Sequence, residues 1–408
     1  MKILISAYAC EPNSGSEPFL GWRWAVEIAK THEVWVITRD NNATLIENEL
    51  MANGNPYNMH FVYIGLNKKL TFWKKGRRGM KLFYTMWQKK AVKVAKKLIQ
   101  REKFDIVHHI TFGAYTQPTY MYELGIPFVW GPLGGGERMP EIKGRKIDFK
   151  SGLYEIMRDL QIRVTNYLPY ARKAMKKASA IIVTTEETRK CFPVKYWDKI
   201  TVMQSLGIDE NFISGRKQEK CKDKVRILMV GRMIGWKGFD IGIAAFRQLI
   251  KKYDNIELHL RGNGDLKSKL KSSCVDLLDK NIFFCDDFLE YSEMYGFYSG
   301  FDIFLNCTLH DSGCLALLEA MSAGLPVVCI DVGGPKVLTD SECAVKVYSN
   351  DYIRLVDMLC TALEQLICNQ ELREVMGKNA EKKVLSQYMY NHKYKEIEKL
   401  YRLITESL

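Results

Sequence analysis

The segment from Phe304 to Pro335 constrains the fold of this chain more than any other stretch. An apolar run at residues 301–305 is followed by a polar break at 310–313, an apolar segment with a single acid, and a second apolar run at 327–330. This order predicts strand, loop, short helix and strand. Such a unit places a helix N-terminus at the carboxyl end of a parallel sheet, where unpaired backbone N–H groups and the helix dipole favour an anion.

Two acids in this segment, Asp311 and Glu319, stand eight positions apart. On a continuous helix, eight residues return to within about 80° of the starting direction, so both acids can face one cleft. In a simpler interpretation, Asp311 caps the helix and Glu319 points to water. Glu319, however, lies among apolar and small residues in LALLEAMSAG, where an ionised carboxylate needs a partner. A ligand with hydroxyl groups would supply one, and the pattern therefore favours a binding site.

The rest of the chain alternates predicted strands and helices in two halves. Strands are expected at residues 2–8, 33–38, 61–65, 105–110, 180–184, 225–230, 256–260 and 281–285, and helices at 19–30, 151–178, 351–368 and 370–404. A polar stretch at 210–224 is the expected linker between the halves. Two halves of this kind, each with ligand loops at its strand ends, indicate an α/β protein with two Rossmann-like domains that face one another across a cleft.

Three loops of the first half lie where ligands bind in such sheets. The loop at 10–18 contains Gly15 and Ser16, so a ligand can approach its backbone, although many strand-to-helix turns carry such residues. His108 and His109 end a predicted strand, and because successive strand residues face opposite sides, at most one of them points into a given site. A buried structural histidine is the alternative. The run Gly134–Gly136 offers amides to an anion or forms a loop that moves.

The positive charge is concentrated in the first half of the chain. Residues 1–205 contain 33 Lys and Arg against 18 Asp and Glu, a net charge of +15, whereas the remainder contains 27 against 29. Much of the excess lies between Lys68 and Lys103, where basic clusters alternate with aromatic residues. Such a segment binds nucleic acid or an anionic membrane, or is simply a solvated helix face. We favour a surface role for the basic half and expect reversible docking on anionic membranes, with contributions from Lys74, Lys75, Arg77 and Arg78.

Composition and simple motifs exclude several other classes of protein. The hydrophobic content of 47% excludes a disordered chain, and no apolar run of 18 residues predicts a membrane-spanning helix. The N-terminal MKILISAYA is too short for the apolar core of a secretory signal. Eleven cysteines without a CxxC pair fit reduced thiols in a cytosol better than disulfides or a zinc site. No Asp-x-Asp metal signature occurs.

Two elements carry a resemblance to a known family. The segment from Asp311 onward resembles the signature of the retaining glycosyltransferases of family 4: an acid, seven residues, Glu319, then Ala-Met-small-small-Gly-x-Pro-Val-Val. The segment Gly231–Gly238, GRMIGWKG, is similar to the Gly-Arg…Lys-Gly element of that family. The usual first acid is Glu, and Asp311 departs from it, as Ser205–Gly207 departs from the usual Asn-Gly at the end of the first domain.

The resemblance covers most of the chain, is strongest over residues 225–335, and implies the GT-B fold. In that fold the first domain would comprise residues 1–207 and would bind the acceptor. The second, residues 208–387, would bind a nucleotide-sugar. A C-terminal helix, about 388–408, would cross back to the first domain.

The resemblance also implies roles for individual residues. Glu319 would hold the ribose of the donor, Asp311 would address the transferred sugar, and Arg232 and Lys237 would neutralise the diphosphate. Family members carry a functional histidine at the end of the strand predicted at 105–110, often as HxH. The third position here is Ile110, so His109 is preferred and His108 is the alternative. Further donor contacts are expected from Gly15, Ser16, Gly231, Gly313, Cys314 and Leu315.

The expected function is that of a retaining glycosyltransferase of the hexosyltransferase type that needs neither a metal nor a cofactor. It would move a sugar from a UDP- or GDP-sugar to a glycan or lipid-linked acceptor, in bacterial surface polysaccharide biosynthesis. We expect it in the cytoplasm, peripheral on the inner face of the membrane, without a nucleic-acid partner. One alternative is a nucleotide-sugar epimerase of the same fold, which would convert the donor without an acceptor. Another is a non-enzymatic protein that binds membranes or nucleic acid, with salt-dependent binding and no turnover.

Overall fold

The computed structural model describes residues 1–12, 15–55, 58–67, 69, 71–74, 76 and 79–406. The chain forms two compact units. Unit 1 comprises Met1–Gly136, Leu160–Ser205 and Tyr390–Leu408, and unit 2 comprises Glu137–Asp159 and Leu206–Met389. Four cations of the predicted basic segment, Lys68, Lys75, Arg77 and Arg78, lie outside the described residues, as do Asn13 and Ser14 of the first loop and the side chain of Ser16.

The sheet of unit 1 is parallel throughout, with the strand order β3-β2-β1-β4-β5-β6-β7 in the described residues. Its central strands are buried on both faces, as is usual in parallel sheets; Ile3, Leu4 and Ile5 of β1, for example, are fully buried. The strands are β1 (Lys2–Ser6), β2 (Glu33–Arg39), β3 (Met59–Ile64), β4 (Ile106–His109), β5 (Phe128–Leu133), β6 (Ala180–Val183) and β7 (Ile200–Val202). The helices are α1 (Ser16–Ala29), α2 (Ala43–Asn53), α3 (Met80–Leu98), α5 (Pro169–Lys177), α6 (Glu186–Lys190) and α15 (Tyr390–Glu406).

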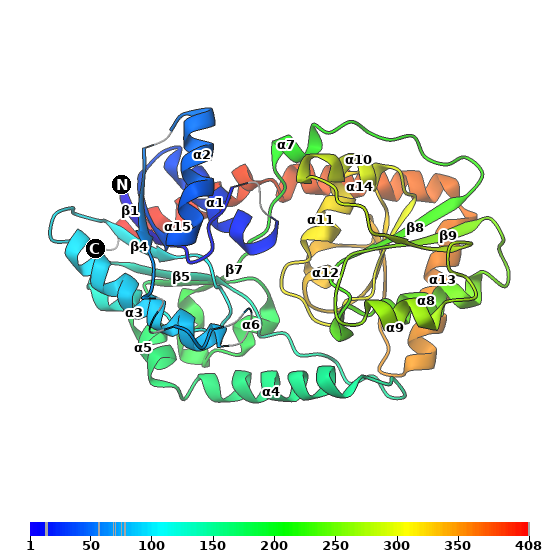
Figure 1. Cartoon of the computed structure of the whole chain (residues 1–408), viewed down its shortest axis with the longest axis horizontal. Coiled ribbons are helices and arrows are strands. Elements are labelled where there is room, and N and C mark those ends of the chain that lie inside the picture. The colour runs from blue at the N-terminus through cyan, green and yellow to red at the C-terminus, as the bar shows by residue number, and fades with distance from the viewer. Residues whose placement is uncertain are drawn as a thin grey trace. The chain divides into compact units, whose positions relative to one another are not determined.

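Unit 2 repeats this architecture with a second parallel sheet, of order β10-β9-β8-β11-β12-β13 (Figure 1). Its strands are β8 (Val225–Val230), β9 (Ile256–Arg261), β10 (Ile282–Cys285), β11 (Ile303–Asn306), β12 (Val327–Ile330) and β13 (Ala344–Val347). Its helices are α7 (Glu210–Ile213), α8 (Phe239–Leu249), α9 (Lys267–Ser273), α10 (Met294–Ser299), α11 (Leu315–Ser322), α12 (Gly333–Leu338), α13 (Tyr352–Cys368) and α14 (Gln370–Gln387). The predicted class, α/β with two Rossmann-like domains, is confirmed.

Two of the predicted helices are each divided into two helices in the structure. The helix expected at 151–178 is two helices, α4 (Phe149–Thr165) and α5. The break falls at Leu168, whose backbone is extended, with φ −74° and ψ 134°, because a proline disfavours helical conformation in the residue before it and Pro169 then opens α5. The stretch expected at 370–404 is likewise α14 and α15. There the amide of Ile208 donates to the Tyr388 carbonyl at 2.8 Å, and Met389 forms a bridge with Ile208.

The segment Glu137–Asp159 groups with unit 2, whereas the prediction assigned all of residues 1–207 to the first domain. Arg145 explains the grouping, because its guanidinium donates to both carboxylate oxygens of Asp240 at 3.0 and 2.8 Å and to the Gly235 carbonyl at 2.6 Å. Bidentate pairs of this kind fix geometry strongly. The backbone of Lys143 adds hydrogen bonds with Asn350 and Tyr352.

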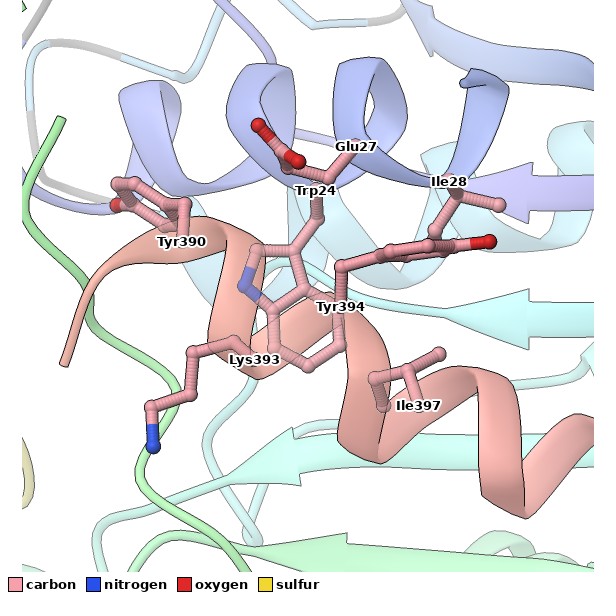
Figure 2. Close-up of a pocket in the computed structure, with 7 residues that line it drawn as sticks. All are labelled: Trp24, Glu27, Ile28, Tyr390, Lys393, Tyr394 and Ile397. Carbon is pink, nitrogen blue, oxygen red and sulfur yellow. The ribbon is translucent and has the colours of Figure 1, made fainter. Parts of the chain in front are cut away.

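The last helix, α15, belongs to unit 1 and packs on α1. A small hollow lies between these two helices (Figure 2). Its lining consists of Trp24, Glu27 and Ile28 from α1 with Tyr390, Lys393, Tyr394 and Ile397 from α15. None of these residues is among those predicted to bind or react, so the hollow is a packing feature of the two helices. Among the described residues, no helix is long and apolar enough to cross a membrane.

Candidate functional site

The carboxyl ends of adjacent strands in unit 2 bring four loops into contact. These loops follow β8, β9, β11 and β12, and glycines allow their backbones to approach closely. A Cβ atom on Gly262 would lie 1.9 Å from the Gly231 carbonyl oxygen. A Cβ on Gly238 would lie 2.1 Å from that of Cys307, and one on Gly333 would lie 2.7 Å from that of Asp311. The site predicted from the sequence is therefore built on one sheet edge.

An ion pair between Lys237 and Asp311 lies at the centre of this edge. Lys237 ends the short 3₁₀ turn η5 (Gly235–Lys237) after β8, and its ammonium group donates to Oδ2 of Asp311 in the loop after β11. Burial acts to raise the pKa of the Asp311 carboxyl, but the charge and hydrogen bond of Lys237 hold it below its ordinary value. Burial likewise acts to lower the pKa of Lys237, and Asp311 holds it above its ordinary value. Both groups are therefore charged at neutral pH.

The loop that carries Asp311 is fixed by backbone hydrogen bonds. The Gly313 amide donates to Oδ1 of Asp311 at 3.2 Å, and the Gly334 amide donates to its carbonyl oxygen at 2.6 Å. Cys314 then adopts a left-handed conformation, with φ 56° and ψ 59°, and precedes the first residue of α11, Leu315. The first amides of a helix have no intrahelical acceptor. The loop therefore presents the start of α11 beside the ion pair, as the sequence predicts.

Aromatic side chains surround the cations. Arg232 is exposed, and its guanidinium lies 5.8 Å from the centre of the Trp236 ring, while the Lys237 ammonium lies 4.7 Å from it. Trp236 stacks on His310 at 4.5 Å, and Nε2 of His310 lies 3.0 Å from a carboxylate oxygen of Glu155. Trp236, His310 and Glu155 were not predicted. Trp236 and His310 could have been predicted, because each directly precedes a predicted site residue, Lys237 or Asp311. Glu155 is remote in sequence, so no local pattern indicated it.

Glu319 is buried in α11, with 7% of its surface exposed. The Tyr298 hydroxyl donates to Oε2 of Glu319 at 2.8 Å, so the protein itself supplies one partner for this carboxylate. Burial nevertheless raises the pKa of Glu319 to about 7. The group is thus balanced between its neutral and ionised forms near neutral pH. Tyr298, from α10, was not predicted.

In unit 1, the loop between β1 and α1 is held by an acid. Gly15 is exposed and precedes α1, and the backbone of Ser16 is the first residue of that helix. Oε1 of Glu17 accepts a hydrogen bond from the Gly113 amide at 3.0 Å. Burial raises the pKa of this carboxyl. Glu17 therefore connects the start of α1 with the loop that follows β4. The two histidines are the last residues of β4.

The two histidines have different environments. Nδ1 of His108 lies 2.5 Å from the Tyr401 hydroxyl and Nε2 lies 2.7 Å from the Gly131 carbonyl oxygen, so His108 is fully engaged inside unit 1. Nε2 of His109 lies 3.4 Å from the Tyr84 hydroxyl, and its buried Nδ1 has no hydrogen-bond partner among the described residues. Burial lowers the pKa of each to about 3. The contacts of His108 are structural in kind, whereas His109 keeps one ring nitrogen available.

The run Gly134–Gly136 was predicted to offer amides to an anion or to form a loop that moves. Two of the three amides at Gly134–Gly136 are used inside unit 1: that of Gly134 donates to the Gly113 carbonyl at 2.7 Å, and that of Gly136 donates to the Thr188 hydroxyl at 3.2 Å. They are not offered to an anion. In the part of the chain that the structure describes, no group of three or more His, Cys, Asp and Glu side chains could hold a metal ion.

Solved structures with this fold extend over the whole chain. A glycosyltransferase from Rickettsia africae has 16% identity and a TM-score of 0.65, and the match covers 99% of this chain and 98% of that one. A sucrose-phosphate synthase from Thermosynechococcus elongatus has 14% identity and a TM-score of 0.67, with full coverage of both chains. The Anabaena protein HepE, solved in complex with UDP, has 14% identity, a TM-score of 0.62 and coverage of 98% and 99%. The fold is therefore the GT-B fold.

The sequence of unit 2 resembles a known family. Residues 212–383 match the family described as glycosyl transferases group 1. An uncharacterised glycosyltransferase of Methanocaldococcus jannaschii is 24% identical over 52% of this chain and 50% of its own. The capsular polysaccharide biosynthesis glycosyltransferase CapM of Staphylococcus aureus is 23% identical over 48% of this chain and 51% of its own. The chain thus spans about half the length of the curated relatives it matches.

Proposed function

We propose that the protein is a glycosyltransferase that takes a sugar from a UDP- or GDP-sugar and transfers it with retention of configuration. The proposal is carried by a cluster of charged side chains at the strand ends of unit 2. Lys237 and Asp311 form an ion pair there, and the Arg232 guanidinium lies beside the ring of Trp236. Two cations next to a carboxylate and a helix start suit a ligand that combines an anionic diphosphate with sugar hydroxyls.

The donor diphosphate is the ligand of the cations in this proposal. Arg232 and Lys237 neutralise its charge, together with the amides of Gly313, Cys314 and Leu315 and the backbone of Gly231. When the diphosphate binds Lys237, the Asp311 carboxylate becomes free to accept hydrogen bonds from hydroxyls of the transferred sugar. As the bond from the anomeric carbon to the diphosphate breaks, the cations stabilise the charge that develops on the leaving group. Neither a metal nor another cofactor is required.

Glu319 binds the ribose of the donor. Its carboxylate accepts one hydrogen bond from Tyr298 and has remaining acceptor capacity for two ribose hydroxyls. Hydrogen bonds to the ionised form favour that form, so donor binding lowers the pKa of Glu319 from about 7 and releases a proton.

Unit 1 binds the acceptor, with Gly15 and Ser16 also near the donor. His109 is neutral at physiological pH, because burial lowers its pKa to about 3, and it acts as a hydrogen-bonding group rather than as a cation. His108 supports it from within unit 1. The acceptor hydroxyl attacks on the face that the diphosphate leaves and passes its proton to the departing diphosphate, so that configuration is retained through an oxocarbenium-like transition state.

The proposed acceptor is a glycan or a lipid-linked sugar in the assembly of a bacterial surface polysaccharide. CapM, named for capsular polysaccharide biosynthesis, supports this class, and so does WaaG, a structural neighbour described as a glycosyltransferase of lipopolysaccharide biosynthesis. The reaction would take place in the cytoplasm, at the inner face of the cell membrane.

A panel of UDP- and GDP-sugars screened by thermal shift tests the donor, because a ligand that binds the native state raises the unfolding temperature according to its occupancy. We expect one donor to stabilise the protein and to release its nucleoside diphosphate only when an acceptor is added. Conversion of that donor to an epimer without acceptor would establish the epimerase instead. Absence of any stabilisation and of any turnover across the panel would contradict both enzymes.

A further inference from the structure

Helix α4 carries its apolar side chains on the outside. Phe149, Leu153, Ile156, Leu160 and Val164 recur every three or four residues and therefore form one stripe. Their exposed fractions lie between 40% and 84%. Met157 lies on the same stripe, and Tyr167 continues it just beyond the helix. Soluble domains rarely leave so continuous an apolar row in contact with water, so the stripe indicates a binding surface.

The opposite face of α4 is buried and partly charged. Glu155, with 9% of its surface exposed, is held by His310 and by Arg158, while Ile162 and Thr165 are buried beside the rest of the helix. The buried face is thus mixed, with Glu155 and Thr165 beside the apolar Ile162, while the longer apolar stripe faces outward. A helix on a protein surface usually buries its apolar stripe.

The charges beside the stripe are positive. Lys150 and Arg163 are the exposed charged side chains of α4, and helical geometry places them on the two sides of the stripe. Lys143 and Lys146 precede the helix and are also exposed. Among the described residues 138–177, Glu141 is the exposed acid, whereas the exposed cations also include Arg138, Arg172, Lys173, Lys176 and Lys177.

We infer that α4 (Figure 1) is a membrane-docking helix that lies in the surface of a bilayer containing anionic phospholipid. An apolar stripe with cations at both edges is the pattern of interfacial helices, in which apolar side chains enter the acyl boundary and cations meet the headgroups. A second copy of this chain would present the same cations, so charge complementarity favours lipid over self-association. This inference rests on the proposed function and extends it, because it names the surface at which a lipid-linked acceptor is met.

The membrane contact is thus placed on α4, in addition to the basic clusters expected to make it. The basic clusters between Lys68 and Lys103 supply charge, and a contact made by charge alone is lost at high salt. A contact made by the stripe combines apolar insertion with charge and should survive high salt in part. Salt dependence therefore separates the two elements.

The test uses the full chain and sedimentation with vesicles of phosphatidylcholine, with or without phosphatidylglycerol. We expect the parent protein to sediment with the vesicles that contain phosphatidylglycerol. The triple variant Leu153→Gln, Ile156→Gln, Leu160→Gln should reduce vesicle partitioning by about tenfold or more, because it removes the centre of the apolar stripe. A matched control, Val194→Gln, Val275→Gln, Ile353→Gln, replaces apolar side chains of similar exposure elsewhere and should bind as the parent does.

Three results would overturn the inference: no sedimentation of the parent with either vesicle at low salt, equal sedimentation of the triple variant and the parent, or a parent dimer that the triple variant converts to a monomer. The last result would assign the stripe to contact between copies. Donor turnover with a water-soluble acceptor is measured in parallel. It should be unchanged in the triple variant, so a failure of docking is distinguishable from a failure of the proposed transferase activity.

Discussion

The carboxyl of Glu319 connects binding with stability. Its pKa of about 7 in the folded chain lies above the ordinary value of 4.5. The folded state therefore holds this proton more tightly than the unfolded state does. The stability that this proton contributes is fully present below about pH 4.5 and is lost as the pH rises through about 7.

Glu319→Gln should accordingly raise the free energy of unfolding above pH 7, by about 3 kcal/mol, and change it little near pH 4.5. Denaturant unfolding of both proteins across this range measures the difference. The same variant should bind the donor more weakly by about tenfold, because it loses the charge on the acceptor oxygens. A parent and variant with parallel stability profiles would show that Glu319 titrates normally, and equal donor affinity would remove it from the ribose site.

Arg232 and Lys237 differ in what their loss should do. Replacing either by Ala should lower turnover by about 10²-fold, the scale of one preorganised charge contact. Arg232 is exposed, so its variant should keep the stability of the parent, whereas Lys237→Ala leaves the Asp311 carboxylate without its counter-charge and should also lower the free energy of unfolding. Turnover at saturating donor and thermal unfolding separate the two effects.

Arg247→Ala is the matched control, since this partly exposed arginine of α8 pairs with Asp276, away from the strand ends of unit 2. It should leave turnover unchanged. Activity of the Arg232 and Lys237 variants within about threefold of the parent would make both residues ordinary surface charges.

The charged residues at the strand ends of unit 2 were predicted from the sequence, but their neighbours were not. Asp311, Glu319 and Lys237 could be predicted because glycines and apolar runs flank them in the sequence. Tyr298 could not be, because one aromatic residue in a short apolar helix has the same appearance whether its hydroxyl meets a carboxylate or water. The structural contacts of His108 were not predictable either, because its partner Tyr401 is 293 positions away in the sequence.

At the scale of elements, turns with left-handed glycines set the position of Asp311. Gly333 has φ +54°, and a side chain there would meet the Asp311 carbonyl oxygen at 2.7 Å. Gly333→Ala should therefore combine backbone strain of about 1 kcal/mol with displacement of the loop, and should raise the KM for donor by about tenfold or more. Steady-state kinetics and thermal unfolding measure these effects.

Gly125→Ala provides the control for this element. Gly125 has φ +75° with no atom within 4 Å of a new Cβ, so it carries the backbone strain alone. It should lower stability modestly and leave the KM for donor unchanged. An equal effect of both variants on KM would show that the Gly333 turn does not position Asp311.

The order of strands and helices was largely predictable because parallel strands are short, apolar and bounded by turn residues. The boundaries at 165–169 and 388–389 were missed, and no glycine or proline marks the second of them. A proline sets the first break, and a backbone contact with Ile208 sets the second. Only the first of these causes is visible in the local sequence.

At the scale of the whole molecule, the chain passes between its two units more often than the sequence suggests. The prediction assigned residues 1–207 and the C-terminal helix to the first domain, whereas the structure also groups Glu137–Asp159 with the second unit. For that segment, the deciding contact is the pair of Arg145 and Asp240, separated by 95 positions. No local pattern announces such a contact, although the family resemblance indicated the return of the last helix.

The charge distribution of the whole molecule leads to a prediction about metals. In the proposed reaction, Arg232 and Lys237 already neutralise the departing diphosphate, and the carboxylate nearest to them, Asp311, is engaged by Lys237. A divalent cation would have to compete with Lys237 for that carboxylate. Turnover should therefore be the same, within about twofold, with EDTA and with added Mg²⁺ at matched ionic strength.

Lys237→Ala makes this test sharper. If the protein needs no metal, Mg²⁺ should not restore the turnover of the variant to that of the parent, because a hydrated ion does not replace the preorganised ammonium group of Lys237. Initial rates of nucleoside diphosphate release for parent and variant, each with EDTA and with Mg²⁺, give the four values required. A collapse of the parent rate in EDTA that Mg²⁺ reverses would show that a cation shares the charge of the leaving group, and the proposed division of work between Lys237 and Arg232 would then be wrong.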